Sequence, residues 1–225
     1  MPERDPFFEQ HNIDISFLND TDYVRRALAL SKQAHDGEIR KIRGEPFLTH
    51  PLGVVAISSA YNRSDESQAL GLMHDFSDSP FARERISLSE VREIFGLEMV
   101  LRIGSLSKSR KITDPEGQRK DYLEITKNED DALVQETRAA DKIHNLRMAG
   151  EELLFVDHSS LFWSKFKGGR EAYLQWPRDV LAALVGSKAL DHHLILDEYA
   201  DELETFYRTV AQVEKDENPP LGRPA

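Results

Sequence analysis

The chain reads Ala69-Leu70-Gly71-Leu72-Met73-His74-Asp75, an apolar run that ends in a histidine and an aspartate. This run predicts a buried helix that extends to Asp78 and ends near Pro80. An imidazole nitrogen beside a carboxylate oxygen suits a divalent first-row metal and leaves coordination positions for water and substrate. Neighbouring residues on a helix point about 100° apart, so His74 and Asp75 share a cation only at the helix flank. Another segment must therefore complete the site.

Three residues elsewhere are candidates to complete it: His50 upstream, Asp78 one helical turn on, and Asp141 far downstream. A His-Asp pair by itself is a weak signal, because the chain contains a second example in Asp191-His192. That second pair precedes another histidine and has no partner motif nearby, so we expect it on the surface. The sequences around His50 and Asp141 distinguish the first pair from the second.

Residues 35–51 read HDGEIRKIRGEPFLTHP, and residues 138–147 read RAADKIHNLR. The first stretch resembles the motif A-H-x-G-Q-x-R-x-x-G-E-P-Y-I-x-H-P of the RelA/SpoT-type hydrolase domain. The second resembles the K-L-A-D-R-x-H-N-M-R motif of the same family, and Leu106-Ser107-Lys108 between them is similar to its V-x-K-L stretch. Three motifs in the family's order make this resemblance specific, and it covers residues 20–150.

The resemblance implies an all-α HD-domain helical bundle with additional C-terminal helices, and the activity of a small alarmone hydrolase. It implies one divalent cation per chain, manganese in the first place with other divalent metals open, and removal of the 3′-pyrophosphate from guanosine tetra- or pentaphosphate, (p)ppGpp. The implied metal ligands are His50, His74, Asp75 and Asp141. The residues expected to bind the nucleotide are Arg40, Lys41, Phe47, Lys108, Arg138 and Asn145, and those expected at the catalytic acid positions are Asp78 and Ser79.

The chain departs from the family where that motif reads H-D-x-x-E-D. Asp78 replaces the glutamate and Ser79 replaces the second acid. A serine cannot act as a carboxylate base, and acid–base assistance is typically worth about 10²–10⁴-fold. The sequence therefore leaves three functions open: the alarmone hydrolase, a related nucleotide phosphohydrolase such as an NADPH phosphatase, and a catalytically weakened nucleotide-binding protein. If Ser79 marks a weakened hydrolase, Ser79→Asp is predicted to raise turnover.

Composition and charge constrain the partners. The net charge of −11 argues against a stable nucleic-acid complex, which calls for a strongly basic face. Arg40 and Lys41, on a predicted solvated loop, and two further basic clusters at Lys108–Lys111 and Arg138–Arg147 lie beside the expected ligands, where a local field attracts phosphate. The chain has no cysteine, no signal-peptide pattern and no apolar run long enough to span a membrane. We expect a cytoplasmic protein without a membrane partner, and a homodimer remains open.

Periodic apolar residues and caps predict helices throughout and no strand. The expected helices are at about 21–35, 51–61, 69–78, 87–96, 97–106, 118–127, 130–150, 177–187 and 189–213. Asp20 or Thr21 and the capping box at Ser87 mark two helix starts. We expect an N-terminal arm at 1–19, the HD phosphohydrolase core at 20–150, a C-terminal helical extension at 151–214, and a disordered tail at 215–225.

Overall fold

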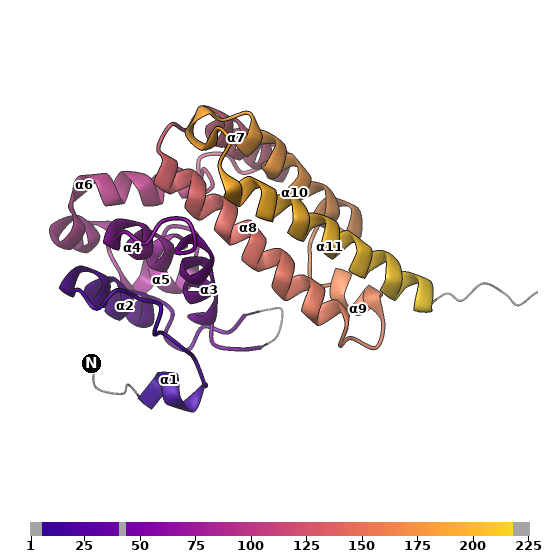
Figure 1. Ribbon diagram of the computed structural model, residues 1–225, viewed down its shortest axis with the longest axis horizontal. Coiled ribbons are helices and arrows are strands. Elements are labelled where there is room, and N and C mark those ends of the chain that lie inside the picture. The colour runs from indigo at the N-terminus through magenta and orange to yellow at the C-terminus, as the bar shows by residue number, and fades with distance from the viewer. Residues whose placement is uncertain (1–5, 41–43, 218–225) are drawn as a thin grey trace, which may run out of the picture.

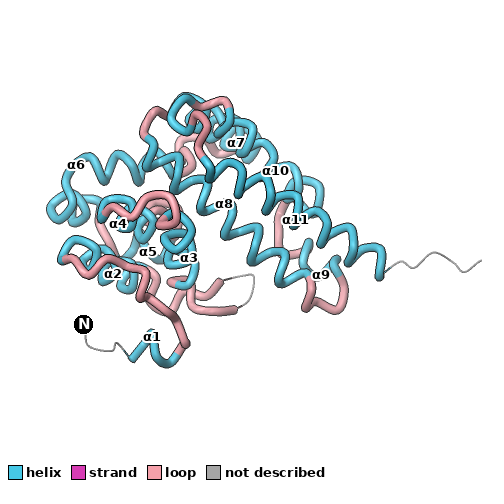
Figure 2. The backbone as a smooth tube through the Cα atoms, in the orientation of Figure 1, coloured by secondary structure: helices cyan, strands magenta, loops and turns pink. Residues whose placement is uncertain are grey.

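The computed structural model describes residues 6–40 and 44–217, and every regular element in these ranges is a helix (Figures 1 and 2). The helices are α1 (Pro6–Gln10), α2 (Asp22–Ala34), α3 (Thr49–Ser58), α4 (Asp65–Met73), α5 (Pro80–Arg85), α6 (Leu88–Leu106), α7 (Pro115–Asn128), α8 (Ala132–Leu153), α9 (Ser159–Trp163), α10 (Gly169–Val185), the 3₁₀ turn η1 (Lys188–Leu190) and α11 (Leu194–Glu217). The all-α fold class is therefore confirmed. The β pairing found in these ranges is one isolated bridge between Ile39 and Pro46.

Side-chain caps fix several helix starts where the sequence places them. The Thr21 hydroxyl accepts the Val24 amide at the start of α2, and the Ser87 hydroxyl accepts the Glu90 amide at the start of α6. Gly96 has a φ of 88° and breaks α6 into two segments. The left-handed backbone at this position favours glycine, which is why the expected end at Gly96 coincides with a kink.

Other boundaries differ from the expectation. Helix α4 ends at Met73, so His74 caps it and Asp75 and Asp78 lie on the following turn instead of on the helix. Helix α10 begins at Gly169, eight residues before the predicted start, and continues through Pro177. Helices α5 and α9, with six and five residues, are too short to show a repeat in the sequence.

Helix α8 connects two hydrophobic clusters. On one side it packs against α3, α4 and α6, and on the other against α10 and α11 (Figure 1). The first cluster is centred on residues of α2 and α4 such as Val24 and Leu72, and the second on residues of α8 and α11 such as Ile143 and Phe206. The first turn of α3, the end of α4 and the middle of α8 therefore meet between the two clusters.

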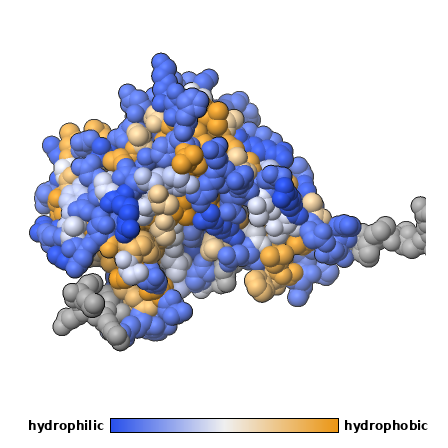
Figure 3. All heavy atoms as spheres, viewed as in Figure 1, coloured by the Kyte–Doolittle hydropathy of each residue, from blue (hydrophilic) through white to orange (hydrophobic). Residues whose placement is uncertain are grey.

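Parts of the predicted N-terminal arm and of the predicted tail are helical. The predicted N-terminal arm includes α1, whose Phe8 is buried in the first cluster. Helix α11 continues to Glu217, three residues into the predicted tail, and residues 218–225 lie outside the described part. In residues 6–40 and 44–217, none of the helices combines the length and apolar composition needed to cross a bilayer. The face shown in Figure 3 is mostly hydrophilic, with separate hydrophobic areas.

Candidate functional site

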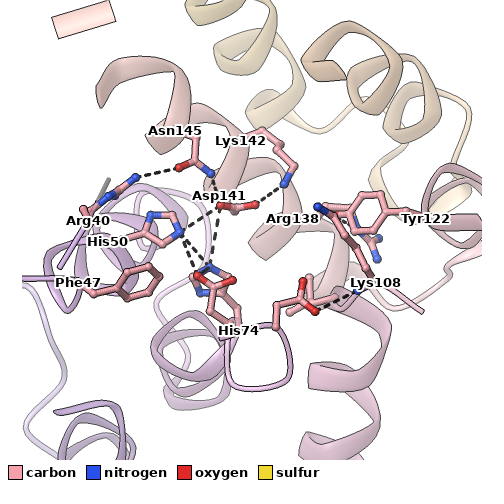
Figure 4. A pocket seen from close by; sticks show the side chains of 13 residues that line it. Arg40, Phe47, His50, His74, Lys108, Tyr122, Arg138, Asp141, Lys142 and Asn145 are labelled. Carbon is pink, nitrogen blue, oxygen red and sulfur yellow. Dashed lines mark hydrogen bonds and ion pairs between the residues drawn. The ribbon is translucent and has the colours of Figure 1, made fainter. Parts of the chain in front are cut away.

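Three segments bring the expected metal ligands together (Figure 4). His50 lies in the first turn of α3, His74 and Asp75 follow α4, and Asp141 lies in the middle of α8. Both histidines are buried, whereas the Asp75 side chain keeps 26% of its surface exposed. Three segments, the first and last 91 positions apart in the sequence, thus line one pocket.

The separations between these donor atoms suit one cation. Nε2 of His50 lies 3.2 Å from Nε2 of His74 and 3.2 Å from an Asp141 oxygen. An Asp75 oxygen lies 3.4 Å from Nε2 of His50 and 3.3 Å from Nε2 of His74. Donors bonded to one first-row cation at about 2.1 Å are themselves about 3.0–3.5 Å apart. Nε2 of His74 lies farther from the Asp141 oxygen, at 4.0 Å, and the donor atoms of His50, His74 and Asp141 all lie within 4.8 Å of one another. These three residues can hold one divalent metal, Asp75 lies beside both imidazoles, and the two imidazoles favour a first-row metal over magnesium or calcium.

The ring of His74 is oriented for this role. Its Nδ1 lies 2.8 Å from the Gly71 carbonyl oxygen, which makes Nδ1–H the donor and directs Nε2 to the carboxylates. Burial opposes protonation of His74, but the charges of Asp75 and Asp141 outweigh it and raise its pKa to about 9. In the metal-free pocket, a proton on Nε2 thus takes the place that a cation would occupy.

His50 is oriented by His144. Nδ1 of His50 lies 3.0 Å from Nδ1 of His144, to which Arg40 also donates at 3.3 Å. Burial, together with the charges of His50 and Arg40, lowers the pKa of His144 to about 2, so its Nδ1 is an acceptor for both neighbours. A Cβ at Gly53 of α3 would lie 2.1 Å from the His144 ring. The close approach of α3 to α8 therefore requires glycine at this position.

Lys142, the next residue on α8, and the two histidines keep Asp141 ionised. Burial alone would raise its pKa, but the charge of Lys142 and the hydrogen bond from His50 hold it far below its usual value. Lys142 Nζ lies 2.5 Å from Asp141 Oδ2, and the Asn145 amide donates to Oδ1 at 2.6 Å. Arg40 in turn donates to the Asn145 oxygen at 3.0 Å. Arg40 is thus a buried member of this network, and the expectation that it belongs to a solvated loop is wrong.

These residues line a cavity of about 240 Å³ whose wall also carries four basic side chains. The residues that line it are Arg40, Phe47, His50, His74, Asp75, Asp78, Leu106, Lys108, Tyr122, Arg138, Asp141, Lys142 and Asn145. Phe47 stacks on His35 with centroids 4.6 Å apart and meets the His50 ring edge-on at 5.7 Å. The fully buried Arg138 donates to Gln135, to Ser105 and to the Tyr122 hydroxyl. Its guanidinium therefore contributes positive charge to the cavity wall, while most of its N–H groups donate to other residues of the protein.

The two expected acid positions separate in space. Asp78 lines the cavity, and its Oδ1 accepts the Lys108 amide at 3.3 Å. Burial, followed by the charge of Asp75, raises the pKa of Asp78. Ser79 is not among the lining residues: its hydroxyl accepts the Ala82 amide at the start of α5 and donates to Glu38 at 2.9 Å. The expectation of Ser79 as a residue of the reaction pocket is thus not supported by its position.

Arg147 of the expected basic cluster does not line the cavity, whereas Tyr122, to which no role was assigned, does. Lys41 lies outside the described residues. Arg147 pairs instead with Glu198 and Glu202 of α11. Sequence reasoning gave no role to Tyr122, which lines the cavity, or to His144, which contacts His50, and it placed Lys142 only in a basic cluster. His144 and Lys142 stand inside the quoted 138–147 motif, which could have indicated them, whereas Tyr122 on α7 has no sequence signal.

Comparison with known proteins agrees with this geometry. Residues 27–154 match the HD domain family, and the chain belongs to that family. Its relatives include a GTP pyrophosphokinase of Myxococcus xanthus, which is 31% identical over 154 residues that cover 65% of this chain and 19% of that protein. A guanosine-3′,5′-bis(diphosphate) 3′-pyrophosphohydrolase of Haemophilus influenzae is 31% identical over 129 residues, or 54% of this chain and 18% of that protein. The chain thus spans about a fifth of the length of these relatives.

Two solved structures share the fold. One is described as a metazoan ortholog of SpoT that hydrolyzes ppGpp and plays a role in starvation responses; its TM-score is 0.63 at 21% identity, with 82% of this chain and 97% of that chain covered. The other is lmo0812 of Listeria monocytogenes, with a TM-score of 0.59 at 22% identity and coverage of 75% and 99%. At these identities the likeness establishes the HD-type helical fold.

Proposed function

We propose that this protein is a manganese-dependent hydrolase that removes the 3′-pyrophosphate from (p)ppGpp and yields GDP or GTP. The observation that carries the proposal is the cluster of His50, His74 and Asp141, with an Asp75 oxygen within 3.4 Å of both imidazole nitrogens, in a cavity lined by four basic side chains. A divalent cation in such a site polarises a phosphoryl oxygen and activates water for attack on phosphorus. The remaining steps belong to side chains around it.

The basic side chains of the wall stabilise phosphate charge. Lys108, Lys142 and Arg40 all line the cavity, and Arg40 is held in place by His144 and Asn145. Such fixed cations offset charge that builds on the transferred group without having to reorient during the reaction. Phe47 offers a ring without a hydroxyl, so its contact with a base would be apolar.

Asp78 is the carboxylate proposed for proton transfer. It lines the cavity but does not belong to the proposed ligands, and burial, followed by the charge of Asp75, raises its pKa, which makes it a stronger proton acceptor than an ordinary aspartate. In this proposal Asp78 accepts the proton of the attacking water. The Lys108 amide, which donates to Asp78, holds the carboxylate in place.

The relatives support this choice of substrate. Several curated proteins similar to this chain are named guanosine-3′,5′-bis(diphosphate) 3′-pyrophosphohydrolases. Others are named GTP pyrophosphokinases, so a shared domain alone does not fix the activity. The metal ligands and the basic wall favour hydrolysis, because both features serve a phosphoanhydride substrate and a metal with open positions.

The proposal is tested by a screen of purified protein, loaded with manganese, against phosphorylated nucleotides that include ppGpp, pppGpp, GTP and NADPH, with identification of the products. We expect pyrophosphate from ppGpp and pppGpp and no product from GTP. Phosphate release from NADPH alone would assign the related phosphatase activity instead. Tight binding of ppGpp without turnover of any nucleotide would assign a nucleotide-binding protein.

A further inference from the structure

One carboxylate outside the reaction cavity makes two short side-chain contacts. Oε2 of Glu38 lies 2.7 Å from Nδ1 of His35 and accepts a hydrogen bond from the Ser79 hydroxyl at 2.9 Å. The His35 side chain is fully buried, and that of Glu38 is 12% exposed. Burial lowers the pKa of His35, and its Nε2 has no hydrogen-bond partner in the described part of the chain. A neutral ring with the proton on Nδ1, donated to Glu38, accounts for both observations.

The Ser79 hydroxyl faces this carboxylate and the first turn of α5. It accepts the Ala82 amide at 3.2 Å while it donates to Glu38, so both of its hydrogen-bonding functions are used. Aspartate and serine are both good N-cap residues. The capping role at position 79 therefore explains a short oxygen-bearing side chain there, and it leaves open which partner of the contact bears the negative charge.

We infer that Glu38 supplies, from the opposite side of one hydrogen bond, the carboxylate that is absent at position 79. The quoted family motifs have glutamine where this chain has Glu38 and aspartate where it has Ser79. A glutamine and an aspartate at these two positions would likewise supply one carboxylate and one neutral group that can donate to it. The two differences from the motifs thus compensate each other, and the serine at position 79 does not mean that a catalytic group has been lost.

This contact joins the two segments that carry the first three ligands. On one side, Glu38 holds His35, whose ring stacks on Phe47, and Phe47 contacts the ring of His50. On the other side it holds Ser79, whose amide donates to the Asp75 carbonyl at 2.9 Å. Glu38 is therefore a positioning residue for His50 and for the Asp75–Asp78 turn. Its effect on turnover rests on the proposed function, whereas its effect on metal binding and stability does not.

The inference reverses the expectation for Ser79→Asp. An aspartate at position 79 would place a second carboxylate in contact with Glu38, and two like charges in a partly buried pair destabilise it. Glu38→Gln has the opposite fault, because it leaves position 79 without a carboxylate partner. Combining the two substitutions restores one carboxylate and one neutral partner with the charge on the other side.

The experiment compares the wild type with Glu38→Gln, Ser79→Asp and the double variant. Three properties are measured for each protein: the midpoint of thermal unfolding, the affinity for manganese alone by calorimetry, and pyrophosphate release from ppGpp. Asp36→Asn, which removes an exposed carboxylate from the same loop, is the matched control. Asp36→Asn combined with Ser79→Asp tests whether loss of any nearby negative charge suffices.

Each single variant should unfold at a temperature several degrees below the wild type. Manganese affinity or turnover should fall by about 10–100-fold, the range for partners that orient metal ligands. The double variant should return close to wild-type values in all three measurements. Asp36→Asn should behave like the wild type, and its combination with Ser79→Asp should be as impaired as Ser79→Asp alone.

Losses in midpoint and manganese affinity that simply add in the double variant would overturn the inference. So would rescue of Ser79→Asp by Asp36→Asn to the same extent, because that result would indicate a general charge effect. If midpoint and affinity are rescued while no protein of the series hydrolyses ppGpp, the exchange of the carboxylate stands and the proposed substrate fails. If the wild type hydrolyses ppGpp and the double variant shows no rescue, the proposed function stands and this inference fails.

Discussion

At the scale of single residues, proton and cation compete for Nε2 of His74. Nδ1–H of His74 donates to the Gly71 carbonyl, so the proton that a metal must displace is the one on Nε2. The carboxylates raise the pKa of His74 to about 9, above its ordinary value of 6.5, while Asp75 and Asp141 themselves are already ionised at neutral pH. Manganese binding between pH 7 and 9 should therefore release about one proton from His74.

The predicted consequence is an apparent manganese affinity that increases with pH. The sign follows from the raised pKa: below about 9 the ring is protonated in the metal-free protein, so affinity rises by up to about tenfold per pH unit and then levels off. Calorimetry at pH 7.5 in two buffers with different ionisation enthalpies measures the proton directly. Proton release of zero, with an affinity independent of pH, would contradict this account of His74, and His192→Ala serves as a control on an exposed histidine.

Asp78 should matter for turnover more than for metal binding. Asp78→Asn keeps the size of the side chain and removes the proposed base, so we expect turnover of ppGpp to fall by about 10²–10⁴-fold. Manganese affinity should change much less, because Asp78 lies outside the four ligands. Steady-state kinetics and calorimetry on the same preparation separate the two effects. Asp201→Asn, on an exposed part of α11, controls for loss of an aspartate, and equal turnover in all three proteins would exclude Asp78 as the base.

At the scale of elements, the contact between α3 and α8 depends on Gly53. A methyl group there would lie 2.1 Å from the His144 ring, so Gly53→Ala must displace that ring or separate the helices. We expect an unfolding midpoint lowered by several degrees and weaker manganese binding, since His144 orients His50. Gly104→Ala on α6 is the matched control, because its added methyl group meets nothing within 4 Å and alanine favours a helix. Similar behaviour of the two variants would contradict the proposed role of the close contact.

The helix boundaries show which parts of the structure can be predicted from the sequence. Caps such as Thr21 and Ser87 act within a few residues, so they can be read locally, and the motifs contain three segments whose side chains meet in the cavity. The end of α4 at Met73 was missed because the apolar pattern continues to Phe76, which is buried in the turn. The separation of Asp78 from Ser79 was missed for a related reason: it depends on a hydrogen bond from Ser79 to Glu38, 41 residues away. Contacts between residues this far apart in the sequence do not affect the local spacing of apolar residues.

At the scale of the whole molecule, the proposed metal ligands lie where the two hydrophobic clusters meet. His74 follows a helix of the first cluster, and Asp141 lies on α8 beside residues of the second. A cation bound there links both clusters and binds the folded state preferentially. At a concentration 100 times the Kd, such binding stabilises by about 2.7 kcal/mol. That corresponds to an increase in unfolding midpoint of about 5–11 °C for a domain of this size.

Thermal unfolding with manganese and with a chelator tests this linkage. The unfolding midpoint of the wild type should rise with manganese. That of Asp141→Ala should not, because the variant lacks the carboxylate that lies near both histidines. Asp191→Ala, at the second Asp-His pair on the exposed surface, should respond like the wild type. An equal manganese response in the wild type and in Asp141→Ala would place the cation elsewhere.

The central claim is that the four-ligand site hydrolyses the 3′-pyrophosphate bond of ppGpp, and phosphorus NMR follows that bond directly. With manganese and the wild type, we expect the resonances of the 3′-diphosphate to disappear while free pyrophosphate and GDP appear in equal amounts. Asp141→Ala, confirmed to be folded, should leave the spectrum unchanged. Release of orthophosphate in place of pyrophosphate, or equal rates for the wild type and Asp141→Ala, would contradict the claim.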